Sequence, residues 1–155
     1  MKYYYKYNIL NKDIFIVSEN EKIILVRDNY INEKGDINNE TKLIERCHKQ
    51  IEEYISGRRN TFDVEFELKG TKFQRKVYDA LINVPYGETR TYKQISEIVN
   101  SPKASRAVGN ACNKNPLLFL VPCHRVVGTN GDLTGFALGL DMKENLLEIE
   151  KVTLK

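Results

Sequence analysis

One stretch of the sequence, residues 117–127, reads LLFLVPCHRVV. Its first five residues are all apolar, which predicts a buried strand that ends at Pro122. Cys123 follows that strand directly. A cysteine after an apolar run is usually an inert core thiol, but His124 and Arg125 place a base and a fixed cation beside this one and favour the thiolate. The residues alone leave two interpretations open, a core thiol and a nucleophile.

A carboxylate that orients the histidine would complete a nucleophile relay. The last helix is expected to begin at about Asp141, and Glu150 on that helix is the acid that we favour for this role. Adjacent side chains seldom hydrogen-bond to each other, so a water between Cys123 and His124 is more plausible than direct contact. Thiol, base and orienting carboxylate would then form the general arrangement of nucleophilic catalysis.

The region before this stretch predicts three helices. Thr71 and Gln74 form a capping box that opens the first. Thr91 begins the second, and Ser101-Pro102 is expected to cap a third over residues 103–113. A helix, a turn of about three residues and another helix are the spacing of a helix-turn-helix.

The third helix is made mostly of small residues, from which one arginine, Arg106, projects. Small residues on an exposed helix let a partner approach its backbone closely, although the same face would also pack well on a neighbouring helix. Residues 90–125 carry six basic residues against one acid, Glu97. A positive segment in an otherwise balanced chain favours an anionic partner, so we interpret this helix as a nucleic-acid docking element.

Composition excludes several classes of protein. The chain has 155 residues, of which 41% are hydrophobic and 29% charged, as in globular domains rather than disordered or fibrous chains. No apolar run approaches the roughly 18 residues of a membrane span. The N-terminus MKYYYKYNIL lacks the long apolar core of a signal peptide. We therefore expect a protein without membrane contact, located in the cytoplasm. We also expect it to be a monomer.

Residues 1–68 predict a small strand-rich domain. Residues 14–17 and 23–26 read as a hairpin, residues 43–55 as an amphipathic helix, and residues 62–68, where apolar and polar residues alternate, as a further strand. The chain is thus expected to be α+β. Its second domain, the remainder from residue 69 to residue 155, would be mostly helical and carry the helix-turn-helix and the cysteine.

The cysteines and histidines do not form a metal-binding pattern. The chain has three cysteines, no CxxC motif and two histidines. Cys47 and His48 are adjacent on a predicted helix and therefore point in different directions. We interpret Cys47 as a core residue and expect neither a metal nor a cofactor.

Several segments between residues 71 and 150 form one motif pattern. They are Phe73-Gln74, Val84-Pro85-Tyr86-Gly87-Glu88-Thr89, Tyr92, Ser105-Arg106-Ala107-Val108-Gly109, Asn115-Pro116 and Val121-Pro122-Cys123-His124-Arg125-Val126-Val127. Each segment is weak alone, but PCHRV with an upstream RAVG and NP in this order is a specific pattern. Through these segments, residues 71–150 resemble the O6-alkylguanine-DNA alkyltransferases, also called methylated-DNA–protein-cysteine methyltransferases.

This resemblance implies that Cys123 attacks the O6-alkyl carbon of guanine in double-stranded DNA and keeps the alkyl group, so that each molecule acts once. O6-Methylguanine would be the chief substrate, with O4-methylthymine as a further one. His124 would take the thiol proton through water, and Glu150 would hold the imidazole. Asn115 would brace the site. Tyr92 and Lys143 would assist the departing guanine.

The resemblance also implies how the base reaches the cysteine. An alkylated guanine inside a duplex must be flipped out at a cost of a few kcal/mol, here from the minor groove. Arg106 would fill the vacated stack, and Tyr92 would crowd the phosphate. The low surface at Ala107 and Gly109 would face the groove, with Lys103 and Lys114 on phosphates.

The resemblance places the substrate pocket at four residues. These are Val126, Phe136, Ala137 and Leu138. The backbone of Cys123, Val126 and Ala137 would read the base edge. Leu138 stands where many relatives carry glycine, so the sequence leaves open whether the pocket admits bulky groups such as benzyl.

Three other functions account for part of the sequence. A Cys–His hydrolase would leave the basic helix pair unused. A non-catalytic protein that binds alkylated DNA would not need a reactive cysteine, which this sequence has. A transcription-factor module is disfavoured because the docking helix has too few side chains to read a major groove.

Overall fold

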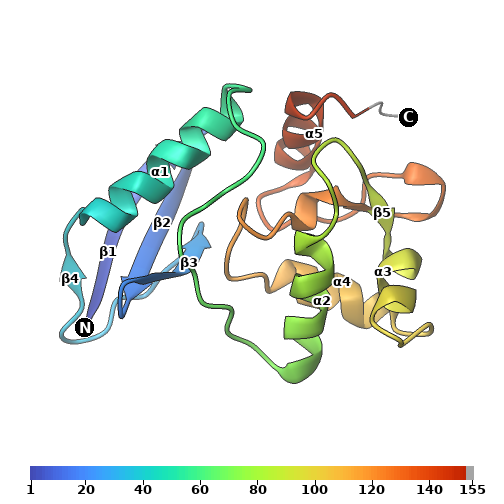
Figure 1. The fold of residues 1–155 in the computed structure, drawn as a ribbon, viewed down its shortest axis with the longest axis horizontal. Coiled ribbons are helices and arrows are strands. Elements are labelled where there is room, and N and C mark those ends of the chain that lie inside the picture. Colours follow the sequence, from blue (N-terminus) through green and yellow to red (C-terminus); the bar gives the residue numbers. More distant parts are fainter. Residues whose placement is uncertain (153–155) are drawn as a thin grey trace. The chain divides into compact units, whose positions relative to one another are not determined.

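The computed structural model describes residues 1–152 and divides the chain into two compact units. Unit 1 comprises residues 1–69 together with residues 116–118. Unit 2 comprises residues 70–115 and the chain from residue 119 onward. Unit 1 contains strands β1 to β4 and helix α1, and the described part of unit 2 contains helices α2 to α5 (Figure 1). The predicted α+β class is confirmed.

Unit 1 is built on a four-stranded sheet with the order β3-β2-β1-β4. Its strands are β1 (Lys2–Ile9), β2 (Lys12–Glu19), β3 (Lys22–Arg27) and β4 (Ile37–Asn38). The first three are antiparallel neighbours joined by two-residue turns at Leu10-Asn11 and Asn20-Glu21, whose residues all have positive φ. Such turns match the twist of paired strands. The predicted hairpin of β2 and β3 is confirmed, whereas β1 was not predicted.

Helix α1 (Lys42–Ile55) packs its apolar side against this sheet. Ile44, Cys47 and Ile51 on that side are fully buried. Cys47 is therefore a core residue, as predicted, and burial raises its pKa to about 12.

The strand predicted over residues 62–68 is wrong. This segment makes only two backbone hydrogen bonds to β3, from Ile23 N to Glu65 O (2.9 Å) and from Glu67 N to Ile23 O (3.0 Å). Gln50 of α1 holds the start of the segment, because its side-chain amide oxygen accepts from Asp63 N at 3.1 Å. Alternating apolar residues thus predicted a full strand where the chain makes a single bridge, from Phe66 to Ile23.

The strand predicted over residues 117–121 is also wrong. All five residues are buried, but only Leu117 bridges to Val26 of β3, and the chain then turns at Phe119, which has φ 72°. A run of apolar residues indicates burial on every side, and a buried turn satisfies that pattern as well as a strand does.

Unit 2 positions the reactive stretch among short elements. In chain order these are α2 (Lys72–Ile82), β5 (Arg90–Thr91), α3 (Tyr92–Ile98), α4 (Ser105–Asn113), the 3₁₀ turn η1 (Cys123–Arg125), β6 (Val126–Val127), η2 (Thr129–Gly131) and α5 (Leu140–Ile149). β5 and β6 pair in parallel. Capping boxes open α2 at Thr71 and α3 at Thr91, which confirms both predicted helix starts.

The predicted start of α4 is wrong. Residues 101–104 form a turn closed by a hydrogen bond from Ala104 N to Ser101 O (2.9 Å), and α4 begins only at Ser105 without a side-chain cap. Proline after a serine is compatible with a helix start but also with a turn, and the turn prevails here. α4 is tied to α2 by Tyr78, whose hydroxyl donates to Ala111 O at 2.9 Å.

Within residues 1–152, no helix is both long enough and apolar enough to cross a membrane.

We expect Thr71→Ala to lower the free energy of unfolding by about 1 kcal/mol, the usual value of an N-cap. The substitution leaves Gln74 N without the acceptor that it has at 3.1 Å. Urea denaturation measures the change. Thr61→Ala is the control, because Thr61 is exposed and caps no helix. Equal losses in both variants would contradict the assignment.

Candidate active site

Cys123 begins the 3₁₀ turn η1 and is buried, with 3% of its surface exposed. Its amide donates to Val121 O at 2.8 Å. The Val121 carbonyl also accepts from the Asn115 side-chain amide at 2.9 Å. Asn115 is fully buried at the end of α4, so it joins that helix to the residue two positions before the cysteine. The contact is compatible with the bracing role that the resemblance implies for Asn115, and that role remains a prediction.

His124 and Glu150 are brought together from the η1 turn and the end of α5. His124 Nε2 lies 2.7 Å from Glu150 Oε2, and both side chains are fully buried. A neutral imidazole that donates from Nε2 to the carboxylate carries its basic lone pair on Nδ1. The pairing predicted for these two residues is therefore present in the fold.

Glu150 has two further partners, which the sequence did not predict. Arg125 binds it with Nε at 2.9 Å from Oε1 and Nη2 at 3.1 Å from Oε2. Gly87 N donates to Oε1 at 3.0 Å. Burial raises the pKa of Glu150, but the hydrogen bonds that it accepts from His124, Arg125 and Gly87 outweigh this effect and lower the pKa to about 2. The carboxylate is therefore ionised throughout the physiological range.

Burial, in contrast, lowers the pKa of His124 and outweighs the opposing effect of its hydrogen bond to Glu150. The imidazole is thus neutral near pH 7 and ready to accept a proton. Arg125 was expected to act as a cation beside Cys123. Its guanidinium instead donates to Glu150, and its Nη1 donates to Val84 O at 2.8 Å. The charge of Arg125 therefore stabilises the Glu150 carboxylate.

Lys143 is a fully buried lysine of α5. Its ammonium donates to the carbonyls of Val126, Thr134 (2.7 Å) and Gly135 (3.3 Å). Burial lowers the pKa of Lys143, and ionisation of the nearby Cys123 thiol would raise it again. Lys143 thus holds the loop after β6 against the segment that follows the cysteine.

Tyr92 connects this centre to α4. Its hydroxyl accepts from the Thr134 hydroxyl at 3.1 Å, and its ring centroid lies 5.9 Å from Lys143 Nζ. On the other side, a Cβ added at Gly109 would lie 3.8 Å from the ring. Glycine at this position therefore lets the Tyr92 ring lie close to the α4 backbone.

An open cleft of about 350 Å³ lies beside Tyr92. Arg106 lines it from α4. Two residues predicted to act on the DNA strand thus share one concave surface. Burial raises the pKa of Tyr92, so its hydroxyl keeps its proton at neutral pH.

The surface of α4 agrees with a docking helix. Arg106 and Ala107 are exposed, and Gly109 is half-buried. Lys103 and Lys114, just before and after the helix, are exposed as well. The alternative, that the small residues pack on a neighbouring helix, holds for part of α4. Ala111 is buried towards α2, and Gly109 lies against the Tyr92 ring, whereas Arg106 and Ala107 face solvent.

The predicted pocket residues lie around the histidine and the loop. Val126 is buried in β6, next to the η1 turn. The Phe136 ring stands edge-on to His124, with ring centroids 6.4 Å apart. Ala137 is half-buried beside it, whereas Leu138 is 4% exposed and directed into the core. The structure thus brings Phe136 into the site and removes Leu138 from the surface.

The sequence analysis missed Gly87, Tyr86 and Thr134 as parts of this site. Tyr86 donates to Ile149 O at 3.2 Å and faces the Arg125 guanidinium, 5.7 Å from its ring centroid. The sequence analysis named Tyr86 and Gly87 only within a segment that carries the family resemblance, without a role in the site. Gly87 has φ 83°, a left-handed conformation that glycine adopts more readily than other residues. The glycine after Pro-Tyr was therefore the one sequence signal for this turn.

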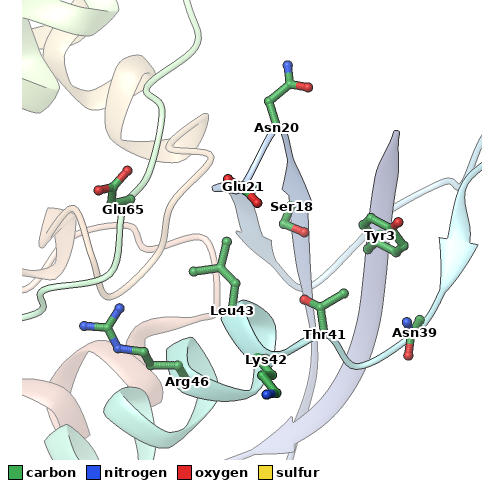
Figure 2. Close-up of a pocket in the computed structure, with 10 residues that line it drawn as sticks. All are labelled: Tyr3, Ser18, Asn20, Glu21, Asn39, Thr41, Lys42, Leu43, Arg46 and Glu65. Carbon is green, nitrogen blue, oxygen red and sulfur yellow. The ribbon is translucent and has the colours of Figure 1, made fainter.

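A second cavity, of about 610 Å³, lies in unit 1 (Figure 2). Lys42 and Arg46 face it from α1, and Glu21 and Glu65 from the β2–β3 turn and the segment after α1. Its charges balance and no cysteine or histidine lines it. Among residues 1–152, no group of three or more His, Cys, Asp or Glu side chains is arranged to hold a metal ion. The chemistry that the described residues offer is therefore concentrated at Cys123.

Comparison with known proteins agrees with this geometry. The model of the 6-O-methylguanine DNA methyltransferase DNA-binding domain matches residues 72–152, more than half of the chain. This chain belongs to that methyltransferase family. The resemblance predicted from the motifs around Cys123 is confirmed.

Relatives in the family cover both units. The constitutive methylated-DNA–protein-cysteine methyltransferase of Bacillus subtilis is 39% identical over 163 residues, which span 100% of this chain and 99% of that protein. The Methanosarcina acetivorans methyltransferase is 55% identical over 102 residues, which span 66% of this chain and 65% of that protein, just under two thirds. The crystal structure of Mycobacterium tuberculosis OGT in complex with DNA superposes with a TM-score of 0.88 at 35% identity, over 96% of this chain and 92% of that one.

We expect the Glu150 carboxyl to titrate near pH 2 in the folded methyltransferase, because its partners stabilise the charged form. The lowered pKa stabilises the fold at neutral pH, and this contribution of roughly 3 kcal/mol is lost as the pH falls from about 5 to about 2. NMR titration of the side-chain carboxyl carbon measures it directly. The exposed Glu144 of the same helix is the internal reference. A midpoint near 4.5 for Glu150 would contradict the assigned network.

Proposed function

We propose that this protein repairs DNA by transferring the alkyl group of O6-alkylguanine, chiefly O6-methylguanine, from duplex DNA to its own Cys123. The observation that carries the proposal is the buried arrangement of Cys123 next to His124, with His124 held by Glu150 at 2.7 Å. Family membership supports the reaction class. A location in the cytoplasm remains a prediction.

The chemistry is a displacement at an sp³ carbon. His124 takes the thiol proton through a water, and the thiolate sulfur forms a bond to the methyl carbon. The bond from that carbon to O6 breaks, and its electron pair stays on the guanine. Because the thioether is too stable to hydrolyse, each protein molecule reacts once.

The leaving guanine needs a proton or a positive charge. The protonated Tyr92 hydroxyl is the donor that we propose, because burial keeps its pKa high. Lys143 is already bound to carbonyl oxygens, so we assign it an electrostatic contribution, together with the fixing of the pocket wall. The backbone of Cys123, Val126 and Ala137 would read the base edge, with Phe136 closing the pocket and Leu138 buried behind it.

The α3–α4 pair would deliver the base. We propose that α4 docks in the minor groove, where Ala107 and Gly109 allow close approach. Arg106 enters the stack as the base leaves it, and Tyr92 crowds the adjacent phosphate. Lys103 and Lys114 bind phosphates.

A non-catalytic protein that binds alkylated DNA is the alternative of a different class. Such a protein would use the same docking surface but would not need a base and a carboxylate that activate a thiol. A Cys–His hydrolase is the lesser alternative, and it would turn over repeatedly.

We expect Cys123→Ser to abolish transfer and to retain binding to duplex DNA that contains O6-methylguanine. Intact mass spectrometry after incubation with that DNA should show one added methyl group on the wild type and none on the variant. Cys112→Ser is the matched control and should stay active, because burial raises the pKa of Cys112 and keeps it a thiol. A plateau above one methyl group per molecule, or transfer by Cys123→Ser, would reject the proposal.

We expect Arg106→Ala to slow repair of duplex DNA at least tenfold and to leave reaction with a short single strand nearly unchanged, because only the duplex requires base flipping. His124→Ala should slow both substrates together, because the relay is needed in either case. The readout is the ratio of second-order rate constants, duplex over single strand. If Arg106→Ala leaves this ratio unchanged, the arginine is only a surface cation.

A further inference from the structure

The first two turns of α2 carry three exposed cations, Lys72, Arg75 and Lys76. Lys69 precedes them, and the chain holds no acid between Lys69 and Asp79. The docking surface proposed above does not include these residues.

The spacing of these cations works against the helix. Lys72 is three and four positions from Arg75 and Lys76, so the side chains are neighbours on one face and repel one another. They also lie at the N-terminal end of α2, whose first turn contains no acid, where the helix dipole favours negative charge. A helix selected only for stability would carry acidic residues here.

These three cations are not paired with carboxylates in the described part of the protein. Among residues 1–152, Lys72, Arg75 and Lys76 form no ion pair, whereas Arg46 and Arg59 of unit 1 bind carboxylates at 2.8 and 3.0 Å. The opposite side of α2 is packed with buried residues, including Val77 and Leu81. The cations therefore face solvent as one surface, here called the α2 cation face (Lys72, Arg75 and Lys76).

The position of this face within unit 2 suits a partner shared with α4. Tyr78 joins α2 to α4 through the Ala111 carbonyl. In Figure 1 the start of α2 and the turn between α3 and α4 both lie toward the lower edge of unit 2. Because α2 packs on α4, a polyanion longer than the α4 contact would reach both helices.

We propose that the α2 cation face binds backbone phosphates of the DNA duplex outside the segment that α4 contacts. The inference rests on the proposed function and extends its footprint along the duplex. The partner is a regular array of phosphates, because the three side chains can contact successive phosphates and none of them is positioned to read a base. Binding to this face is therefore independent of sequence and of the lesion.

The test compares two triple variants that remove the same charge. One is Lys72→Gln, Arg75→Gln, Lys76→Gln. The control is Lys12→Gln, Lys22→Gln, Lys49→Gln, which neutralises three exposed lysines of unit 1. The dissociation constant for an unmodified duplex is measured from 50 to about 300 mM salt, since the slope of log affinity against log salt changes by about 0.9 for each phosphate contact.

We expect the α2 variant to lose about 2 to 3 units of slope, and the control to lose less than 1. Thermal unfolding should show the α2 variant at least as stable as the wild type, because the repulsion is relieved. Weaker binding by an equally stable protein excludes a folding defect.

Equal changes of slope in the two variants, or no change in the α2 variant, would overturn the inference while leaving the proposed function intact. A wild type that does not bind duplex DNA at all would overturn both.

Discussion

The Glu150 carboxylate is held in the interior of unit 2 by His124, Arg125 and the Gly87 amide. A buried carboxylate is stable only when charges and donors replace its lost hydration. These partners come from the turn after α2 and from η1, and Glu150 itself stands at the end of α5. The same contacts that keep Glu150 charged therefore hold three segments together and set the orientation of the imidazole beside Cys123.

Few residues connect Cys123 to α4, the helix that we propose to dock on DNA. Asn115 follows α4 and holds the Val121 carbonyl, while Tyr92 begins α3 and lies against Gly109 and near Lys143. Helix α4 is thus connected to the cysteine through hydrogen bonds and packing within one unit.

The sequence predicted the features that local chemistry determines. Capping boxes at Thr71 and Thr91 placed two helix starts, and the motif around Cys123 identified the family. It did not predict that residues 117–121 turn rather than extend, because burial and not backbone shape produces an apolar run. Nor did it predict Arg125 on Glu150, since neighbours in sequence say little about which side chain meets a carboxylate 25 positions away. The assignment of two domains and the roles of the individual site residues remain predictions.

The short parallel pair of β5 and β6 has a consequence for how the site tolerates change. Thr91 lies opposite Val127, and Arg90 lies opposite Val126. Tyr92 therefore follows one strand of this ladder directly, and Cys123 precedes the other by three residues. The backbone register of β5 and β6 therefore sets the distance between Tyr92 and Cys123, and the size of the side chains does not. Because strand pairing reverses the facing of side chains with each step of register, lengthening or shortening the chain by one residue beside either strand would misalign tyrosine and cysteine more severely than most point substitutions nearby.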